Sequence, residues 1–519
     1  MTRRVDQWLR QPLLAEQPTT DNRRARWILL LLWLGVTLVL AVHHVPWRDE
    51  ARAWSLMQMG QSWPDMFRVV QGEGHPYLWY ILLRAGWDLF GDPLVLRVIA
   101  LSIGIAATAL LVLRAPFRIG ILALIIFSLH LGFEYTVMAR NYGISALVML
   151  AIAALWPRIR DSLWLGVLLL LLANTNVPSV FIAGSLAFYR LLELLGEKRD
   201  LSDPEWRCFA LNGALLLAGT FLCFIAVYPP ANTAAASTSA EPLTFPNLLA
   251  ALFTAKRSFT AIGFGSGSLL GPLTVFASLL LFLERPKALA SALLALVCLK
   301  LFFFFVYPGY SRHVALYFIL TFSLAWIEAQ KGWARDWTTE KARPLLLLGS
   351  SAFIILLCMQ TARYISYPIQ NLALGRPFSH AEDLAHIMAR PELKGAMLMI
   401  DPDTMGEAVV YQTGRPYWLI RQDRPATITP LALSGNKRLT LDRLLQQAEA
   451  IRSRTGKPVV IGLALDIDRS RSGSWDVMYH DYTILTPSSV ARFKEGTRKI
   501  ASLRKGGGDE EYDVYVYPR

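Results

Sequence analysis

Two adjacent carboxylates, Asp49 and Glu50, follow the first long apolar run of the chain, which covers residues 27–45. An ionised side chain at membrane depth costs about 3 kcal/mol or more, so carboxylates beside such a run are expected to have a function. A carboxylate pair can deprotonate a hydroxyl as a general base or bind a divalent cation through its oxygens. We predict that Asp49 is catalytic. For Glu50, simple pairing with Arg48 or Arg52 at the surface stays open as an alternative.

Other polar side chains stand at the ends of later apolar runs and between them. An arginine can hold a phosphate with a two-pronged hydrogen bond, and a lysine can hold it as a point charge. A base, a phosphate clamp and an apolar groove for a lipid tail are together what group transfer from a lipid-phosphate donor requires. The candidates for binding the substrate or its phosphate are Arg140, Tyr142, Lys256, Arg257, Arg312 and His313, and His75 is a candidate for shaping the site or binding a metal.

Several of these residues have a structural interpretation as well. His75 precedes Pro76 and could cap a helix. Arg140 could extend to lipid headgroups, as arginines at the ends of membrane spans often do. Asn174 and Asn176 are better explained as residues that satisfy a helix end than as catalytic residues. The assignment of Lys256 and Arg257 as phosphate contacts depends only on their position in a long loop.

The composition indicates what positions these residues. Of 519 residues, 54% are hydrophobic and only 18% are charged, whereas a soluble protein has about 25% charged residues. A membrane-spanning helix needs roughly 20 mostly apolar residues. We therefore predict an α-helical membrane protein with about eleven spans, at 27–45, 93–113, 119–134, 142–156, 162–177, 178–195, 208–228, 268–283, 288–306, 313–329 and 344–362.

The net charge of +13 is explained by orientation in the membrane and not by nucleic-acid binding. Basic residues collect in the N-terminal segment 1–26 and in alternate short loops, which the positive-inside rule assigns to the cytoplasm. The carboxylate pair and the other candidates then fall on the outer side. So does the C-terminal segment 371–519. The membrane domain, residues 27–370, would carry two long outer loops, 46–92 and 229–267.

Within the first outer loop, residues 75–90 are apolar and aromatic but contain Arg84 and Asp88. We predict an amphipathic helix lying at the outer interface, with a second one over 64–70; an additional span over 75–90 is the alternative. The loop 229–267 is rich in Ala, Ser, Thr and Gly, and a loop of that length is usually functional or disordered.

Segment 371–519 has the pattern of a soluble α/β domain. Strands are predicted at 396–400, 459–465 and 511–517, and helices at 381–389, 405–411 and 439–453. The pairs Asp401/Asp403 and Asp466/Asp468 are expected to end strands, with a metal site as the less favoured alternative. The four cysteines all lie in or beside apolar runs, so no disulfide framework is expected in this domain.

Read in order, these residues resemble the GT-C glycosyltransferases that use polyprenyl-phosphate sugars. The resemblance covers most of residues 27–370. It is carried by Asp49-Glu50, by Gly74-His75-Pro76-Tyr77-Leu78-Trp79-Tyr80 (similar to the family's His-Pro-Pro-Leu-Tyr-Tyr stretch), and by Leu96-Arg97, Ala139-Arg140-Asn141-Tyr142-Gly143 and Tyr310-Ser311-Arg312-His313. Two departures are clear: Tyr77 replaces the second proline, and Thr175-Asn176 stands where many members have Thr-His.

The resemblance implies that Asp49 is the base acting on an acceptor hydroxyl and that Arg140 and Arg312 contact the donor phosphate. It implies that Glu50 and His75 shape the site or bind a divalent metal ion. It also implies two interfacial helices after the first span, an external active site and often an external C-terminal domain.

The function that follows is an inverting glycosyltransferase. It would move a sugar from a polyprenyl-phosphate donor to a glycan, lipid or protein hydroxyl at the outer face of a bacterial inner membrane, with the N-terminus cytoplasmic. Two alternatives stay open: a transporter or flippase of lipid-linked sugars, and a non-catalytic envelope protein that binds glycans. A transporter would be expected to carry polar groups near the membrane midplane and repeated halves, and neither is visible in the sequence.

Overall fold

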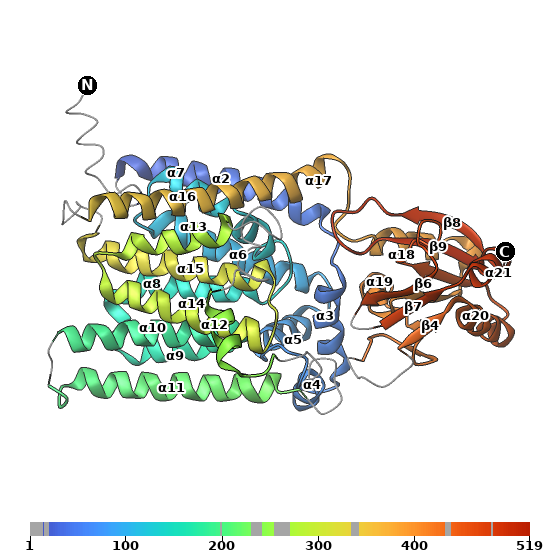
Figure 1. Ribbon diagram of the computed structural model, residues 1–519, viewed down its shortest axis with the longest axis horizontal. Coiled ribbons are helices and arrows are strands. Elements are labelled where there is room, and N and C mark those ends of the chain that lie inside the picture. The colour runs from blue at the N-terminus through green and yellow to red at the C-terminus, as the bar shows by residue number, and fades with distance from the viewer. Residues whose placement is uncertain are drawn as a thin grey trace, which may run out of the picture. The chain divides into compact units, whose positions relative to one another are not determined.

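The computed structural model describes residues 14, 20–197, 200–229, 241–253, 270–333, 342–430, 437–478 and 481–518 (Figure 1). The chain forms two compact units, and neither is continuous in sequence. The first comprises Met1–Val42, Gly74–Tyr228 and Thr238–Pro368. The second comprises His43–Glu73, Pro229–Ser237 and Ile369–Arg519. The segment that carries Asp49 and Glu50 thus groups with the C-terminal residues.

The first unit is a bundle of helices. The helices long and apolar enough to cross a membrane are eight among the described residues: Asn22–His43, Val95–Arg114, Tyr142–Ile159, Val177–Gly196, Pro204–Val227, Pro286–Phe305, Ser311–Gly332 and Arg343–Ala373. These spans correspond to α2 (Thr20–His43), α6 (Val95–Arg114), α8 (Tyr142–Ile159), α10 (Val177–Gly196), α11 (Pro204–Val227), α14 (Pro286–Phe305), α15 (Ser311–Glu328) with η4 (Ala329–Trp333), and α16 (Arg343–Tyr364) with η5 (Ile365–Ile369) and α17 (Gln370–Ala373). The prediction of a multi-span helical membrane protein is confirmed.

The other three predicted spans are shorter helices. Residues 119–134 form α7 (Ile119–Ile126) and a π-helical turn, η1 (His130–Glu134). Helix α9 (Leu163–Ala173) ends where Asn174 begins a turn, and α13 (Leu270–Ser278) continues as a 3₁₀ helix, η3 (Leu279–Phe282). An additional short helix, α12 (Phe245–Phe253), lies within the predicted long loop.

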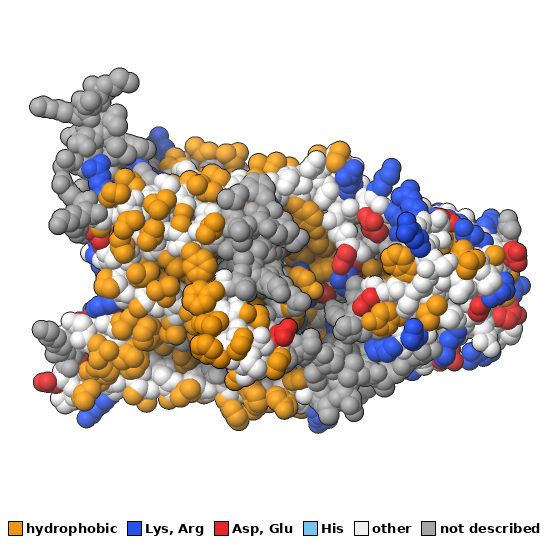
Figure 2. Space-filling model, in the orientation of Figure 1, with side chains coloured by type: hydrophobic (Ala, Val, Ile, Leu, Met, Phe, Trp, Pro, Cys, Tyr) orange, Lys and Arg blue, Asp and Glu red, His pale blue; other side chains and the backbone are white. Residues whose placement is uncertain are grey.

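Helix α15 forms the centre of this bundle. Every residue from His313 to Glu328 is buried, and α15 packs against α8, α14 and α10. Helices α2 and α11 instead expose large apolar side chains, among them Leu32 and Leu217. Figure 2 shows hydrophobic side chains covering the helices of this unit on the face in view. Apolar patches of this extent are expected where helices face lipid.

The second unit is built on a six-stranded sheet with strand order β3-β2-β1-β5-β9-β8. Strand β1 is parallel to β2 and β5, whereas β5–β9, β9–β8 and β2–β3 are antiparallel. The strands are β1 (Met397–Asp401), β2 (Tyr417–Leu419), β3 (Arg424–Ala426), β5 (Val459–Leu463), β8 (Arg498–Leu503) and β9 (Tyr512–Tyr517). A smaller sheet has the order β4-β7-β6, with β4 (Arg438–Thr440), β6 (Gly473–Met478) and β7 (Asp481–Leu485).

Side-chain alternation along the strands places helices on both faces of the main sheet. Leu398 and Ile400 of β1 pack in one core with α18 (Ala381–Met388) and α19 (Gly406–Thr413). Met399, between them, belongs to the opposite core with α20 (Leu441–Thr455) and α21 (Pro487–Gly496). The predicted α/β domain is confirmed, including strands β1, β5 and β9 and helices α18, α19 and α20.

Three helices follow the first span: α3 (Arg48–Met59), α4 (Trp63–Val70) and α5 (Leu78–Phe90). Helices α4 and α5 are the two predicted from the amphipathic pattern; α3 was not predicted from it. Helix α5 starts at Leu78, so His75 lies in the loop that precedes it. Helices α3 and α4 belong to the second unit and α5 to the first.

Candidate active site

Two hydrogen-bonded pairs bring together four of the predicted site residues in the first unit. Nη2 of Arg140 lies 3.0 Å from Nε2 of His75. The hydroxyl of Tyr142 lies 2.8 Å from Nε2 of His313. Tyr142 begins α8, and His313 lies in the first turn of α15. The N-terminal ends of two neighbouring helices and the loop before α5 therefore supply one polar cluster within an apolar bundle.

The hydrogen bonds of His313 indicate its tautomer. The backbone N–H of Tyr310 donates to Nδ1 of His313 at 2.8 Å. Since Nδ1 accepts, the ring proton of neutral His313 is assigned to Nε2, which donates to the Tyr142 hydroxyl oxygen. The Tyr142 hydroxyl then still has its own proton to donate. This arrangement can present an O–H donor to an anionic oxygen.

A second tyrosine fixes the first turn of α15. The hydroxyl of Tyr135 donates to the backbone carbonyl of Arg312, and its ring stacks on Tyr142 with centroids 5.8 Å apart. The guanidinium of Arg312 lies over the Tyr310 ring at 5.3 Å. Arg312, His313 and Tyr142 are thus held by one group of aromatic contacts, and Arg312 adds a positive charge to the cluster.

A buried network supports the start of α8. Asn141 donates to the carbonyl of Thr175, and Ser145 donates to the Thr175 hydroxyl at 2.7 Å. Asn176 caps α10 by accepting from the backbone N–H of Ser179 at 3.1 Å. Asn174 donates to carbonyls of α9 and α11. The interpretation of Asn174 and Asn176 as residues that satisfy helix ends is confirmed.

Two buried ionisable residues of this unit, His130 and Lys300, were not among the candidates predicted from the sequence. His130 is buried in the π-helical turn, with Nε2 3.2 Å from the carboxylate of Glu134, and its ring lies 5.9 Å from that of Tyr135. Lys300 is buried on α14 with its ammonium 5.4 Å from the Phe276 ring centroid. The available signals were a histidine and a glutamate four residues apart at the end of an apolar run, and a lysine inside one.

The carboxylate pair lies in the second unit, in the first turn of α3. The Asp49 side chain is 22% exposed, and its Oδ1 lies 3.9 Å from Nε of Arg48. Glu50, by contrast, is fully buried. Its Oε2 lies 2.8 Å from Nε2 of His44 and accepts from the backbone N–H of Trp47 at 3.1 Å. Glu50 is therefore not at the surface, where the alternative of pairing with Arg48 or Arg52 placed it; its carboxylate caps the N-terminus of α3 from the buried side.

These contacts involve one of the two carboxylate oxygens of Glu50. Oε2 accepts from an imidazole and a backbone amide. Within the described residues, the group of carboxylates close enough to share an ion is Asp466, Asp468 and Asp513. We derive no step of the chemistry through a metal ion at Glu50 and His75.

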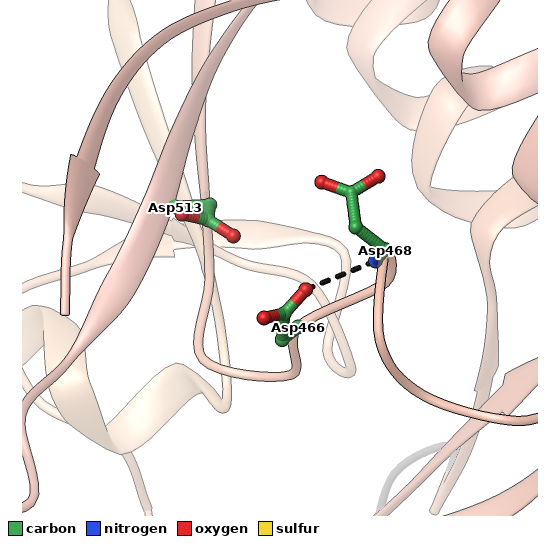
Figure 3. Close-up of side chains that lie close together, drawn as sticks. All are labelled: Asp466, Asp468 and Asp513. Carbon is green, nitrogen blue, oxygen red and sulfur yellow. Dashed lines mark hydrogen bonds between the residues drawn. The ribbon is translucent and has the colours of Figure 1, made fainter.

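The carboxylates of Asp466, Asp468 and Asp513 lie within 4.8 Å of one another in the second unit (Figure 3). Each of the last two is paired with cations: Lys494 with Asp468 at 2.5 Å, and Arg504 with Asp513 at 2.9 Å. The hydrogen bond from Lys494 lowers the pKa of Asp468. Asp466 and Asp468 follow β5, as expected, and stand in the turn after its last residue, Leu463.

The other acidic pair is also structural. Asp401, the last residue of β1, accepts from Arg421 at 2.6 Å. Asp403 accepts from the backbone N–H of Ile420 at 2.8 Å and from that of Arg421 at 3.2 Å. Burial raises the pKa of Asp403 to about 7. Lys256 and Arg257, the remaining predicted phosphate contacts, lie outside the described residues.

Comparisons with known proteins give a fold likeness only. No protein-family model matches the chain, and no curated protein matches it. Two crystal structures of ArnT from Cupriavidus metallidurans are similar to it, one bound to undecaprenyl phosphate and one in the apo state. The TM-scores are 0.45 and 0.43 at 11% and 12% identity. The similarity covers 94% of this chain and 98% and 97% of those chains. We transfer no residue role from these structures.

Proposed function

We propose that the protein is an inverting glycosyltransferase that moves a sugar from a polyprenyl-phosphate donor to an acceptor hydroxyl. The observation that carries the proposal is the polar cluster of Arg140, His75, Tyr142 and His313 at one end of an apolar helical bundle. Polar and charged groups at such a boundary can bind the phosphate of a lipid while its tail remains among apolar helices.

In the proposed reaction, the acceptor oxygen attacks the anomeric carbon of the donor sugar. The bond between that carbon and the phosphate oxygen breaks, and its electron pair leaves with the polyprenyl phosphate. Asp49 takes the proton of the acceptor hydroxyl. A single displacement of this kind inverts the anomeric centre.

Arg140 and Arg312 are assigned to the charge that develops on the leaving phosphate, where fixed donors are most effective. The Tyr142 hydroxyl, polarised by His313, is assigned as a further donor to a phosphate oxygen. Lys256 and Arg257 remain proposed phosphate contacts from the sequence alone. The acceptor is proposed to be a glycan, a lipid or a protein.

The proposal places the reaction on the external side of a bacterial inner membrane. It is supported by the distribution of arginine and lysine among the short loops. It is also supported by where the candidates lie in their helices: Tyr142 starts α8 and His313 is in the first turn of α15, while the basic residue Arg158 lies near the other end of α8.

The test is donor consumption by the purified protein. The protein, reconstituted in liposomes, is incubated with a panel of radiolabelled polyprenyl-phosphate sugars and a membrane extract that supplies acceptors. The proposal expects one donor to be consumed, with release of polyprenyl phosphate and incorporation of label into an acceptor. If label crosses the bilayer without any bond being broken, the protein is a transporter. If donors bind but none is consumed, it is a binding protein.

A further inference from the structure

The segment that carries Asp49 is built into the core of the C-terminal α/β domain. Val45 and Ala51 are fully or almost fully buried and belong to the same hydrophobic core as Leu384, Ile400 and Val514. The indole of Trp54 meets the Tyr411 ring edge-on, with centroids 6.2 Å apart. Helix α3 is therefore one of the elements that cover the main sheet of this domain, together with α18 and α19.

Arg48, directly before Asp49, is held by the loop that precedes β9. Its guanidinium makes a two-pronged hydrogen bond to Asp509, at 2.8 and 2.7 Å. Its backbone N–H donates to Glu510 at 2.7 Å, and Glu510 also accepts from Ser379. Although burial lowers it, the pKa of Arg48 is raised overall by Asp509. Both the main chain and the side chain at position 48 are thus fixed.

Arg52, one helical turn later, is held on the α19 side of the same domain. It donates to Glu407 at 2.8 Å and to the carbonyl of Thr429 at 2.9 Å. It also makes two hydrogen bonds to Glu73, at 3.0 and 2.7 Å. Glu407 is buried and accepts in addition from the backbone N–H of Thr429 at 2.9 Å. This arginine therefore joins three separate segments of the unit.

The spacing of these residues matters for Asp49. Arg48 and Arg52 are four positions apart, so both project from one face of α3, and Asp49 projects from the neighbouring face. A fixed arginine stands on each side of Asp49 within a single turn. Helix α3 therefore cannot slide along its axis or rotate about it, and so displace Asp49, unless an ion pair breaks. A displacement of about 1 Å in a reacting group can cost on the order of 100-fold in rate.

We propose that Arg48 and Arg52 are positioning residues through which the C-terminal domain fixes Asp49 for proton abstraction. The domain is then a part of the catalytic unit, and not an appendage that serves only to bind an acceptor. This inference rests on the proposed function for the role of Asp49. The placement of α3 by the domain does not depend on that function and can be measured separately.

The main variant is Asp509→Asn, which removes the charged partner of Arg48 at an exposed position. Its matched control is Asp442→Asn. Asp442 accepts the same two-pronged hydrogen bond from Arg492, at 2.8 and 2.7 Å, in the same unit, and its side chain is 45% exposed against 56% for Asp509. Both variants lose the charged acceptor of a two-pronged arginine hydrogen bond, one on α3 and one between α20 and α21; the arginine is 11% exposed in the first pair and 54% in the second. A second variant, Glu407→Gln, weakens the hold on Arg52, and Glu407→Asp keeps its charge.

Two readouts are measured on the full-length protein. The first is hydrogen–deuterium exchange of amides in residues 48–59, which we expect to rise about tenfold in Asp509→Asn and not in Asp442→Asn. The second is steady-state transfer, in which kcat should fall about tenfold for Asp509→Asn and about 100-fold for Glu407→Gln, with the donor KM unchanged. Glu407→Asp should recover most of the rate.

The outcomes separate the two claims. If Asp509→Asn and Glu407→Gln exchange and turn over like Asp442→Asn, the positioning role is overturned. A fall in thermal stability equal to that of Asp442→Asn, together with a selective fall in kcat, supports it. If the wild-type protein consumes no donor, the proposed function fails. In that case the exchange readout still decides whether the domain places α3.

Discussion

The hydroxyl of Tyr142 lies 2.8 Å from Nε2 of His313, although 171 positions separate the two residues in the chain. The contact joins the first residue of α8 to the first turn of α15, the most deeply buried of the eight candidate spans among the described residues. A backbone amide donates to Nδ1 of His313. The neutral imidazole therefore carries its proton on Nε2 and donates it to the Tyr142 hydroxyl oxygen. The tyrosine hydroxyl is thereby left as an oriented donor.

We expect Tyr142→Phe to lower kcat by about 100- to 1,000-fold, the range found when one transition-state donor is removed. The matched control is Tyr317→Phe, which removes the hydroxyl of another buried tyrosine, further along α15. Transfer rates and thermal unfolding of both variants are measured in parallel. A Tyr142→Phe protein as active as Tyr317→Phe would show that the hydroxyl has no role in the reaction.

Arg140→Gln is expected to weaken donor binding, because it removes a charge assigned to the donor phosphate. The predicted result is a rise of about tenfold in the Kd for polyprenyl phosphate, corresponding to about 1.4 kcal/mol. Arg158→Gln, at the other end of α8, is the control and should bind as the wild type does. Binding is measured by titration calorimetry in detergent. Equal affinities for the two variants would mean that Arg140 acts only through its bond to His75.

Glu50→Gln tests the role of the second carboxylate at the start of α3. The substitution disrupts the buried hydrogen bonds that Glu50 accepts from His44 and the Trp47 amide. Leaving a buried polar group unsatisfied costs about 1–3 kcal/mol, so we expect a clear fall in the unfolding temperature of the second unit. Glu382→Gln, at an exposed position of α18, should leave it unchanged. If Glu50→Gln is as stable as Glu382→Gln, His44 and Glu50 do not stabilise α3.

The stability of the second unit is expected to depend on pH through buried carboxyl groups. Burial raises the pKa of Glu510 from 4.5 to about 7, with Arg48 acting in the opposite direction. The folded state therefore holds a proton that the unfolded chain releases first. This contribution is fully present below about pH 4.5 and is lost as the pH rises through 7. Unfolding temperatures from pH 5 to 8 should decline, and Glu510→Gln should flatten the decline. An equally steep decline in that variant would assign the effect to other groups, such as Asp403, whose pKa burial also raises.

The sequence predicts the elements that depend on local patterns. Apolar runs predicted the positions of the spans, and the runs ending at Asp401 and Asp466 predicted β1 and β5. Burial of a helix or strand imposes a regular pattern of apolar residues on the local sequence. Short strands such as β2 and β3 carry too few residues to show any period.

The candidate site was only partly predictable. Arg140 and His313 stood out as polar residues beside apolar runs, but their partners His75 and Tyr142 could be assigned only once the helices were placed. The two interpretations of Glu50 could not be separated in the sequence, because its segment groups with residues that begin at Ile369. Contacts over such distances leave no trace in the spacing of a single sequence.

The most direct test of the account is single-turnover transfer by Asp49→Asn, compared with Asp65→Asn. Asp65 stands in the first turn of α4 as Asp49 stands in the first turn of α3, so it controls for loss of an acidic residue at a helix start. With the donor identified in the panel, we predict that Asp49→Asn binds the donor with wild-type affinity but transfers its sugar at least about 1,000-fold more slowly, while Asp65→Asn transfers normally. Transfer by Asp49→Asn at the wild-type rate would contradict the account.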